Sequence, residues 1–189
     1  FHSTEGYINV TANVISDMFA MKSIELIGAN LAEAVANGND IDARENVALA
    51  NTLSGIVESL SGCTSEHSLE HALSAFHHNL PHGAGLIMIS KAYYTFFAKS
   101  GACDEKLIAM AKGLGKKDAK EPMDFVEALV DLQKKCGVDA LKMSDYGITK
   151  SELPEVVKNA RHTMGGLFNV DPAVLSDEDC LKIYEESYR

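Results

Sequence analysis

Residues 66–86 read Glu66-His-Ser-Leu-Glu-His-Ala-Leu-Ser-Ala-Phe-His-His-Asn-Leu-Pro-His-Gly-Ala-Gly-Leu86. His67 and His71 are four residues apart, so on a helix they lie on one face. His82 follows a proline, which is common where a new helix begins. This stretch therefore predicts two successive helices whose junction gathers three histidines.

Three histidines in such a cluster are candidate metal ligands. Neutral imidazole is the commonest protein ligand for divalent transition metals. A helical histidine pair and one histidine from a neighbouring segment supply three nitrogens on one side of an ion. The other side then stays free for a fourth ligand or a substrate. Glycines at 83 and 85 allow a backbone or a ligand to approach this turn closely.

Two other interpretations of the histidines stay open. Histidines at i and i+4 can form an ordinary polar stripe, with one ring buried and the other solvated. His67-Ser-Leu-Glu70-His71 also matches the His-x-x-Glu-His pattern of inverted zinc peptidases, in which the glutamate is the general base. Those peptidases need a mixed α/β domain, and this chain has almost no strand signal. We therefore expect Glu70 to be a solvated or capping-side carboxylate.

Apolar residues recur with helical spacing along almost the whole chain, which predicts an all-α helical bundle. The segment 83–99 is apolar nearly all round and is expected to be the central, buried helix. A loop is expected at 113–115 and a tight turn at 164–169. The remaining helices are expected at 17–36, 43–60, 66–78, 104–111, 122–136, 153–160 and 176–187.

The bulk composition restricts the function. The chain has 189 residues, 46% of them hydrophobic, which is enough for the core of one domain. Its net charge of −10 repels phosphate backbones and anionic membranes, so we expect no nucleic-acid and no membrane partner. The longest apolar run, 84–98, is shorter than a bilayer span. Scattered cysteines without a Cys-x-x-Cys pair predict reduced thiols in a cytoplasmic protein, at Cys63, Cys103, Cys136 and Cys180.

Several segments of the sequence, taken in order, resemble motifs of one protein family. The run from His67 to His71-Ala-Leu, followed by Asn79-Leu-Pro-His82-Gly-Ala, is similar to the metal-site signature of iron-containing (group III) alcohol dehydrogenases. The opening Phe1-His-Ser-Thr-Glu-Gly-Tyr resembles the end of that family's Asp-Ala-Leu-x-His-x-x-Glu-Gly-Tyr motif. Two longer segments agree with the helix before the histidines and with the family's last helix, namely 43–55 and 175–188.

One feature departs from the family pattern. Many members have one residue fewer between the positions of His71 and His82, and the extra residue falls within 76–79. We therefore expect the pocket wall formed by these residues to differ from the family's. His77 and His78 are expected to be exposed or to face a loop, and His162 to lie on the surface or at a helix end.

The resemblance implies a metal site between two domains of a longer protein. Residues 1–189 would be its C-terminal all-helical metal-binding domain, and the start at Phe1 without an initiator methionine fits that expectation. A nucleotide-binding α/β domain would precede it. His2, His67 and His82 would be metal ligands, together with an aspartate four residues before His2. His71 would be the catalytic, non-ligand histidine that lines the pocket near the nicotinamide and the substrate.

The activity implied by the resemblance is NAD- or NADP-linked oxidation of small primary alcohols or diols, and the reverse reduction of aldehydes. Three imidazoles and one carboxylate suit Fe²⁺ and also admit Zn²⁺ or Mn²⁺. The ion acts as a Lewis acid on the substrate oxygen. Family members often form homodimers, which makes a homodimer an expectation here. Two alternatives stay open: a metal-dependent lyase of the dehydroquinate synthase type, and a non-catalytic helical module with structural histidines.

Overall fold

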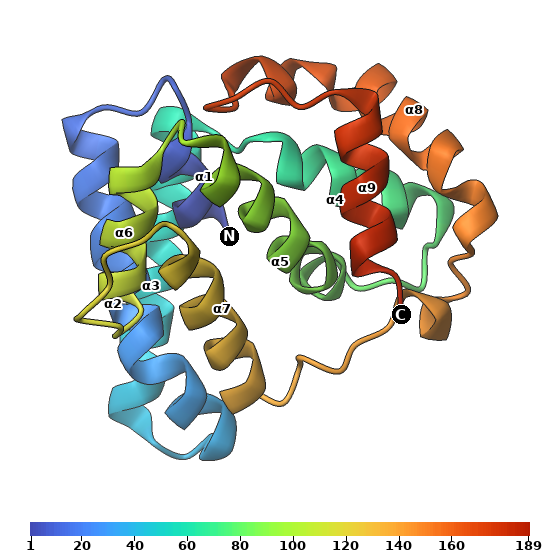
Figure 1. Ribbon diagram of the computed structural model, residues 1–189. Coiled ribbons are helices and arrows are strands. Elements are labelled where there is room, and N and C mark those ends of the chain that lie inside the picture. Colours follow the sequence, from blue (N-terminus) through green and yellow to red (C-terminus); the bar gives the residue numbers. More distant parts are fainter.

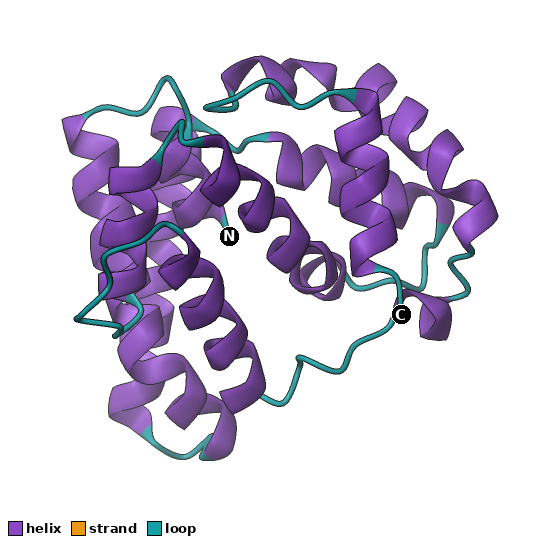
Figure 2. Cartoon of the chain, viewed as in Figure 1, coloured by secondary structure: helices purple, strands orange, loops and turns teal.

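The computed structural model describes residues 1–189, and all of its regular structure is helical, which confirms the predicted all-α class. Figure 2 shows helices joined by loops, without a strand. Three short 3-10 helices lie in the second half of the chain, η1 (Met143–Tyr146), η2 (Lys150–Glu152) and η3 (Gly165–Val170). The α-helices are α1 (His2–Ile8), α2 (Val14–Ala36), α3 (Ile41–Ser61), α4 (Ser65–Phe76), α5 (His82–Ser100), α6 (Asp104–Gly113), α7 (Met123–Lys135), α8 (Leu153–Met164) and α9 (Asp177–Ser187).

Helix α5 is the central element, as its uniformly apolar sequence predicts. It packs against α4, α7 and α9, and so it joins the two sides of the molecule in Figure 1. One side holds the long α2–α3 pair with α1, α6 and α7 against it. The other side holds α4, α8 and α9. The largest buried side chains of α5 are aromatic, namely Tyr93, Tyr94 and Phe97.

Side-chain caps fix where several helices begin. The side chain of Asn13 accepts hydrogen bonds from the backbone of Ile15 and Ser16, at 3.0 and 3.2 Å, so α2 begins three residues before the predicted position. Asp40 accepts from the Ala43 amide at 2.9 Å, and α3 begins at Ile41 rather than at 43. Both differences arise because a polar side chain outside the apolar repeat satisfies the first free amides.

Three other elements differ from the sequence expectation. The first helix, α1, contains glycine and β-branched residues and has no long apolar repeat, and it was not predicted. Helix α8 continues to Met164, four residues beyond the predicted end at 160. The expected tight turn at 164–169 is instead the 3-10 helix η3, whose two leading glycines have ordinary negative φ angles.

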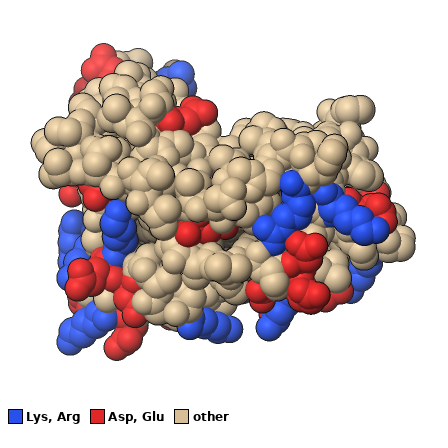
Figure 3. All heavy atoms as spheres, turned by 90° about the horizontal axis from the view of Figure 1, so that it is seen from above, with Lys and Arg blue, Asp and Glu red and all other residues tan.

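The surface has no large region of one charge on the face shown in Figure 3, where acidic and basic side chains intermingle. None of the helices combines the length and the hydropathy that a bilayer-crossing segment needs. All four cysteines are free thiols, as expected. Cys63, Cys103 and Cys180 are buried, and Cys136 is half-buried.

We predict that Gly28→Ala destabilises the protein by about 1–3 kcal/mol, the usual cost of overpacking a tight contact. A Cβ at this position of α2 would lie 2.7 Å from the Leu114 Cα and 2.9 Å from the Gly113 carbonyl oxygen, and backbone atoms cannot move aside. The matched control is Gly55→Ala in α3, where an added Cβ meets nothing within 4 Å. That variant should be neutral or more stable by up to about 1 kcal/mol. Urea unfolding compares the two, and equal effects would contradict the close approach of α2 to α6.

Candidate metal centre

Four histidines lie together where α1, α4 and the start of α5 meet. The ring centroids of His2 and His67 are 4.7 Å apart, and the two rings are stacked. His67 is 5.2 Å from His82, and His82 is 5.1 Å from His71. The structure therefore brings all four histidines singled out by the sequence into one cluster, with His67 in its middle.

The possible ligand atoms of the cluster form two groups, each with atoms within 4.8 Å of one another. One group is His2, Cys63 and His67, and the other is Glu70, His71 and His82. The three predicted ligands His2, His67 and His82 are thus divided between neighbouring groups and do not form one compact set by themselves. Cys63 was not predicted to be part of the site, because a lone cysteine four residues before His67 carries no recognised ligand spacing.

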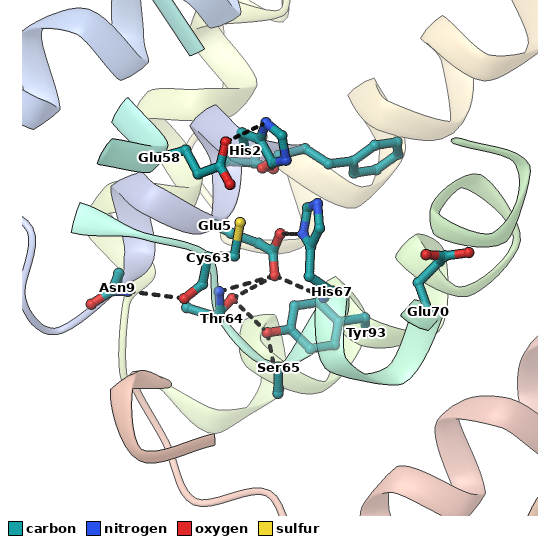
Figure 4. A network of polar contacts seen from close by, with 12 residues as sticks. His2, Glu5, Asn9, Glu58, Cys63, Thr64, Ser65, His67, Glu70 and Tyr93 are labelled. Atoms are coloured by element: carbon teal, nitrogen blue, oxygen red, sulfur yellow. Dashed lines mark hydrogen bonds and ion pairs between the residues drawn. The ribbon is translucent and has the colours of Figure 1, made fainter. Parts of the chain in front are cut away.

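The His67 ring is fixed by a carboxylate and has one free nitrogen. Its Nδ1 is hydrogen-bonded to the Glu5 carboxylate, as Figure 4 shows. The Glu5 side chain is completely buried. Because a carboxylate only accepts, Nδ1 carries a proton, and in the neutral imidazole Nε2 then presents a lone pair. That Nε2 is buried and has no hydrogen-bond partner. A carboxylate behind one nitrogen and an open lone pair on the other is the usual arrangement of a metal-binding histidine.

His82 has a similar carboxylate behind it. Its Nδ1 is hydrogen-bonded to Glu70, whose side chain is fully buried, while the His82 side chain is 47% exposed. Glu70 also accepts a hydrogen bond from the Ser74 hydroxyl. The expectation of a solvated Glu70 is therefore wrong. The carboxylate lies against the first turn of α5, where a Cβ on Gly85 would come within 2.5 Å of it.

The electrostatics keep two histidines neutral. Burial lowers the pKa of His2, and the neighbouring His67 ring acts in the same direction. Partial burial also lowers the pKa of His71. Neutral imidazoles are the form that binds a metal ion. The thiol of Cys63 is held protonated, because burial and the nearby Glu5 raise its pKa.

The other histidines lie outside the cluster. His77 follows the last residue of α4 and is only 14% exposed. It faces the segment 147–152, where its Nε2 lies 3.1 Å from the Glu152 carboxylate, so it is loop-facing and not exposed. His78 is exposed in the following loop, as predicted. His162 is exposed in the last turn of α8, which confirms a surface position at a helix end.

The first turn of α4, which carries His67, is surrounded by buried carboxyl groups. Glu5 accepts from the backbone amides of Thr64 and His67, both at 3.1 Å. Asp171, from the segment after η3, accepts from the Ser65 amide at 3.0 Å. Glu66 is fully buried in the same turn, and burial together with Glu5 raises its pKa well above the ordinary value. Negative charge at a helix N-terminus is favourable, so the first turn of α4 stabilises those of the buried carboxyl groups that are ionised.

Comparisons with known proteins place the chain in one family. The family of Fe-containing alcohol dehydrogenases, C-terminal domain, matches residues 1–188, so the chain belongs to this family. A crystal structure of an archaeal halo-thermophilic alcohol dehydrogenase from a Red Sea brine pool superposes with a TM-score of 0.91 at 28% identity. The match covers 98% of this chain and 48% of that one.

Curated relatives agree with the family assignment over the same range. The chain is 31% identical over 194 residues to the long-chain primary alcohol dehydrogenase AdhA of Thermoanaerobacter ethanolicus, covering 99% of the chain and 47% of that enzyme. It is 27% identical over 194 residues to the 1,3-propanediol dehydrogenase of Citrobacter freundii, covering 99% and 48%. The chain therefore spans about half the length of these relatives.

We predict that Asp171→Asn changes the pH dependence of stability. Burial raises the pKa of Asp171 to about 6, so the folded state binds this proton more tightly than the unfolded state does. The associated stability is present below pH about 4 and is lost as the pH rises through about 6. The wild type should therefore lose stability relative to the Asn variant over this range, by at most roughly 3 kcal/mol. Urea unfolding at several pH values measures this difference, and parallel curves would contradict it.

Proposed function

We propose that this chain is the metal-binding part of an NAD- or NADP-dependent alcohol dehydrogenase that acts on small primary alcohols, diols or their aldehydes. The observation that supports the proposal best is the His67 imidazole, whose Nδ1 proton is held by Glu5 while the buried Nε2 has no partner. Family membership supports the same chemistry. Residues 1–189 would be the C-terminal domain of a longer, cytoplasmic protein, and the cofactor would bind mainly to the preceding domain.

The imidazoles of the cluster are donors that suit a divalent ion, and they come from both groups of possible ligand atoms. We assign His2, His67 and His82 as its ligands, with Fe²⁺ as the first choice and Zn²⁺ or Mn²⁺ as alternatives. A bound ion supplies Lewis-acid stabilisation of the alkoxide that forms when the alcohol loses its proton. Glu5 and Glu70 keep protons on the Nδ1 atoms of His67 and His82, so that both Nε2 lone pairs are available.

His71 has a different role in this proposal. Its ring is 5.1 Å from His82 and its side chain is exposed at the open edge of the cluster. Because its pKa is lowered, the ring is neutral at physiological pH and can accept a proton. We assign it to proton relay or substrate positioning next to the nicotinamide.

Replacement of single histidines in the full-length protein separates these roles. We predict that His67→Ala loses the bound metal and all activity, because it removes the central ring and one of the four donors to the buried Glu5 carboxylate. His71→Ala should retain near-normal metal content but lower turnover by about a hundredfold, a typical loss for a proton-transfer residue. Metal analysis and aldehyde-dependent NAD(P)H oxidation measure the two effects.

The matched control is His162→Ala, which removes an exposed histidine of α8 and should change neither quantity. Loss of metal from the His71 variant would move this residue into the ligand set. A full-length protein that binds no divalent metal would support a non-catalytic helical module instead.

A further inference from the structure

A buried tyrosine lies behind the His67 site. Tyr93, on α5, is completely buried, and its hydroxyl is 2.9 Å from the Thr64 hydroxyl and 3.2 Å from the Ser65 hydroxyl. The same hydroxyl is also within hydrogen-bond distance of a carboxylate oxygen of Asp171, at 3.2 Å. The hydroxyl of Tyr93 therefore touches three polar groups around the start of α4, and Figure 4 shows its contacts with Thr64 and Ser65.

These contacts lead directly to the imidazole. The Thr64 hydroxyl donates to Glu5 Oε1 at 3.0 Å, and the other oxygen of Glu5 is hydrogen-bonded to His67 Nδ1. Tyr93 is thus connected to the His67 ring through two side chains, those of Thr64 and Glu5. All of these groups are buried, where hydrogen bonds are stronger than in water and an unfilled one is costly.

The number of hydroxyl protons makes Tyr93 the junction of this network. Tyr93, Thr64 and Ser65 supply three hydroxyl protons, while Glu5 is taken as an acceptor only. Thr64 has one proton and donates it to Glu5, so a hydrogen bond between the Thr64 and Tyr93 hydroxyls requires the single proton of Tyr93, for which the Asp171 carboxylate competes. The direction of the Tyr93 hydroxyl therefore decides how strongly Thr64 holds the Glu5 carboxylate.

We propose that Tyr93 is a positioning residue of the metal centre, which orients Thr64 so that Glu5 holds the His67 ring with Nε2 toward the ion. This inference rests on the proposed function. Groups behind a metal-binding histidine commonly change metal affinity by about 10–100-fold when they are removed. Tyr93 acts through two intermediaries, so we expect an effect near the lower limit of that range.

The experiment measures Zn²⁺ and Co²⁺ affinity of the full-length protein by chelator competition, together with the visible spectrum of bound Co²⁺. Tyr93→Phe should weaken binding about tenfold and change the Co²⁺ spectrum, because the ligand geometry relaxes. Thr64→Val should weaken binding at least as much, and Thr64→Ser, which restores the hydroxyl, should recover most of it.

The matched control is Tyr94→Phe. Tyr94 is the neighbouring, equally buried tyrosine of α5, and its hydroxyl donates to Thr4 at 2.7 Å instead of to Thr64. This variant loses one buried hydroxyl and should bind both metals like the wild type. Urea unfolding of both tyrosine variants shows whether they lose similar stability, so that a difference in metal affinity is specific to Tyr93.

A double variant tests whether Tyr93 acts on Glu5 through Thr64. If Tyr93 acts through Thr64, adding Tyr93→Phe to Thr64→Val should cost no further affinity, since the connection is already broken. Additive losses, or equal metal affinity of Tyr93→Phe and Tyr94→Phe, would overturn the inference. Should Tyr93→Phe fail to fold, wild-type metal affinity of Thr64→Val would still overturn the inference, because Tyr93 is connected to Glu5 through Thr64.

The outcomes also separate this inference from the proposed function. A wild type that binds neither ion overturns both. A wild type that binds Zn²⁺ and loses it in His67→Ala, while the Tyr93 and Thr64 variants bind normally, overturns only the positioning role and leaves the metal site intact.

Discussion

The carboxylate of Glu5 is the group on which the arrangement of the centre depends. It belongs to α1 and accepts from two backbone amides and one hydroxyl at the start of α4, while it also holds the ring of His67. A carboxylate with no exposed surface is tolerated only when its lone pairs are used, and here four donors use them. Helix packing and imidazole orientation therefore depend on the same hydrogen bonds, so one cannot shift without the other.

Helix α5 contributes both to the hydrophobic core and to the polar network of the metal centre. The ring of Tyr93 makes edge contacts with Tyr94 and Phe97, at centroid distances of 5.2 and 4.9 Å, and belongs to the hydrophobic core. Its hydroxyl belongs to the polar network at the start of α4. The first turn of the same helix carries His82, whose partner Glu70 fits only because Gly85 has no side chain. One rigid helix thus sets the position of two parts of the centre.

The sequence predicted the parts of the structure that leave a local pattern. Apolar periodicity located eight of the nine α-helices, and the spacing of His67, His71 and His82 located the cluster. The roles of Glu5 and Glu70 were not predicted, because a glutamate on a helix has the same local pattern whether it faces water or another helix. The contacts of Asp171 and Tyr93 with Ser65 could not be predicted either, because these residues are separated from Ser65 by 106 and 28 positions in the sequence.

The sequence distance between Asp171 and Ser65 has a consequence for biogenesis. As the chain emerges from a ribosome, α4 and α5 are complete long before residue 171 has been synthesised, and domains form in the order of synthesis. Until then the Ser65 amide lacks its acceptor and must be left to water, because burying it unsatisfied would cost about 1–3 kcal/mol. We therefore expect nascent α4 to keep a frayed beginning until the segment that carries Asp171 folds back onto it.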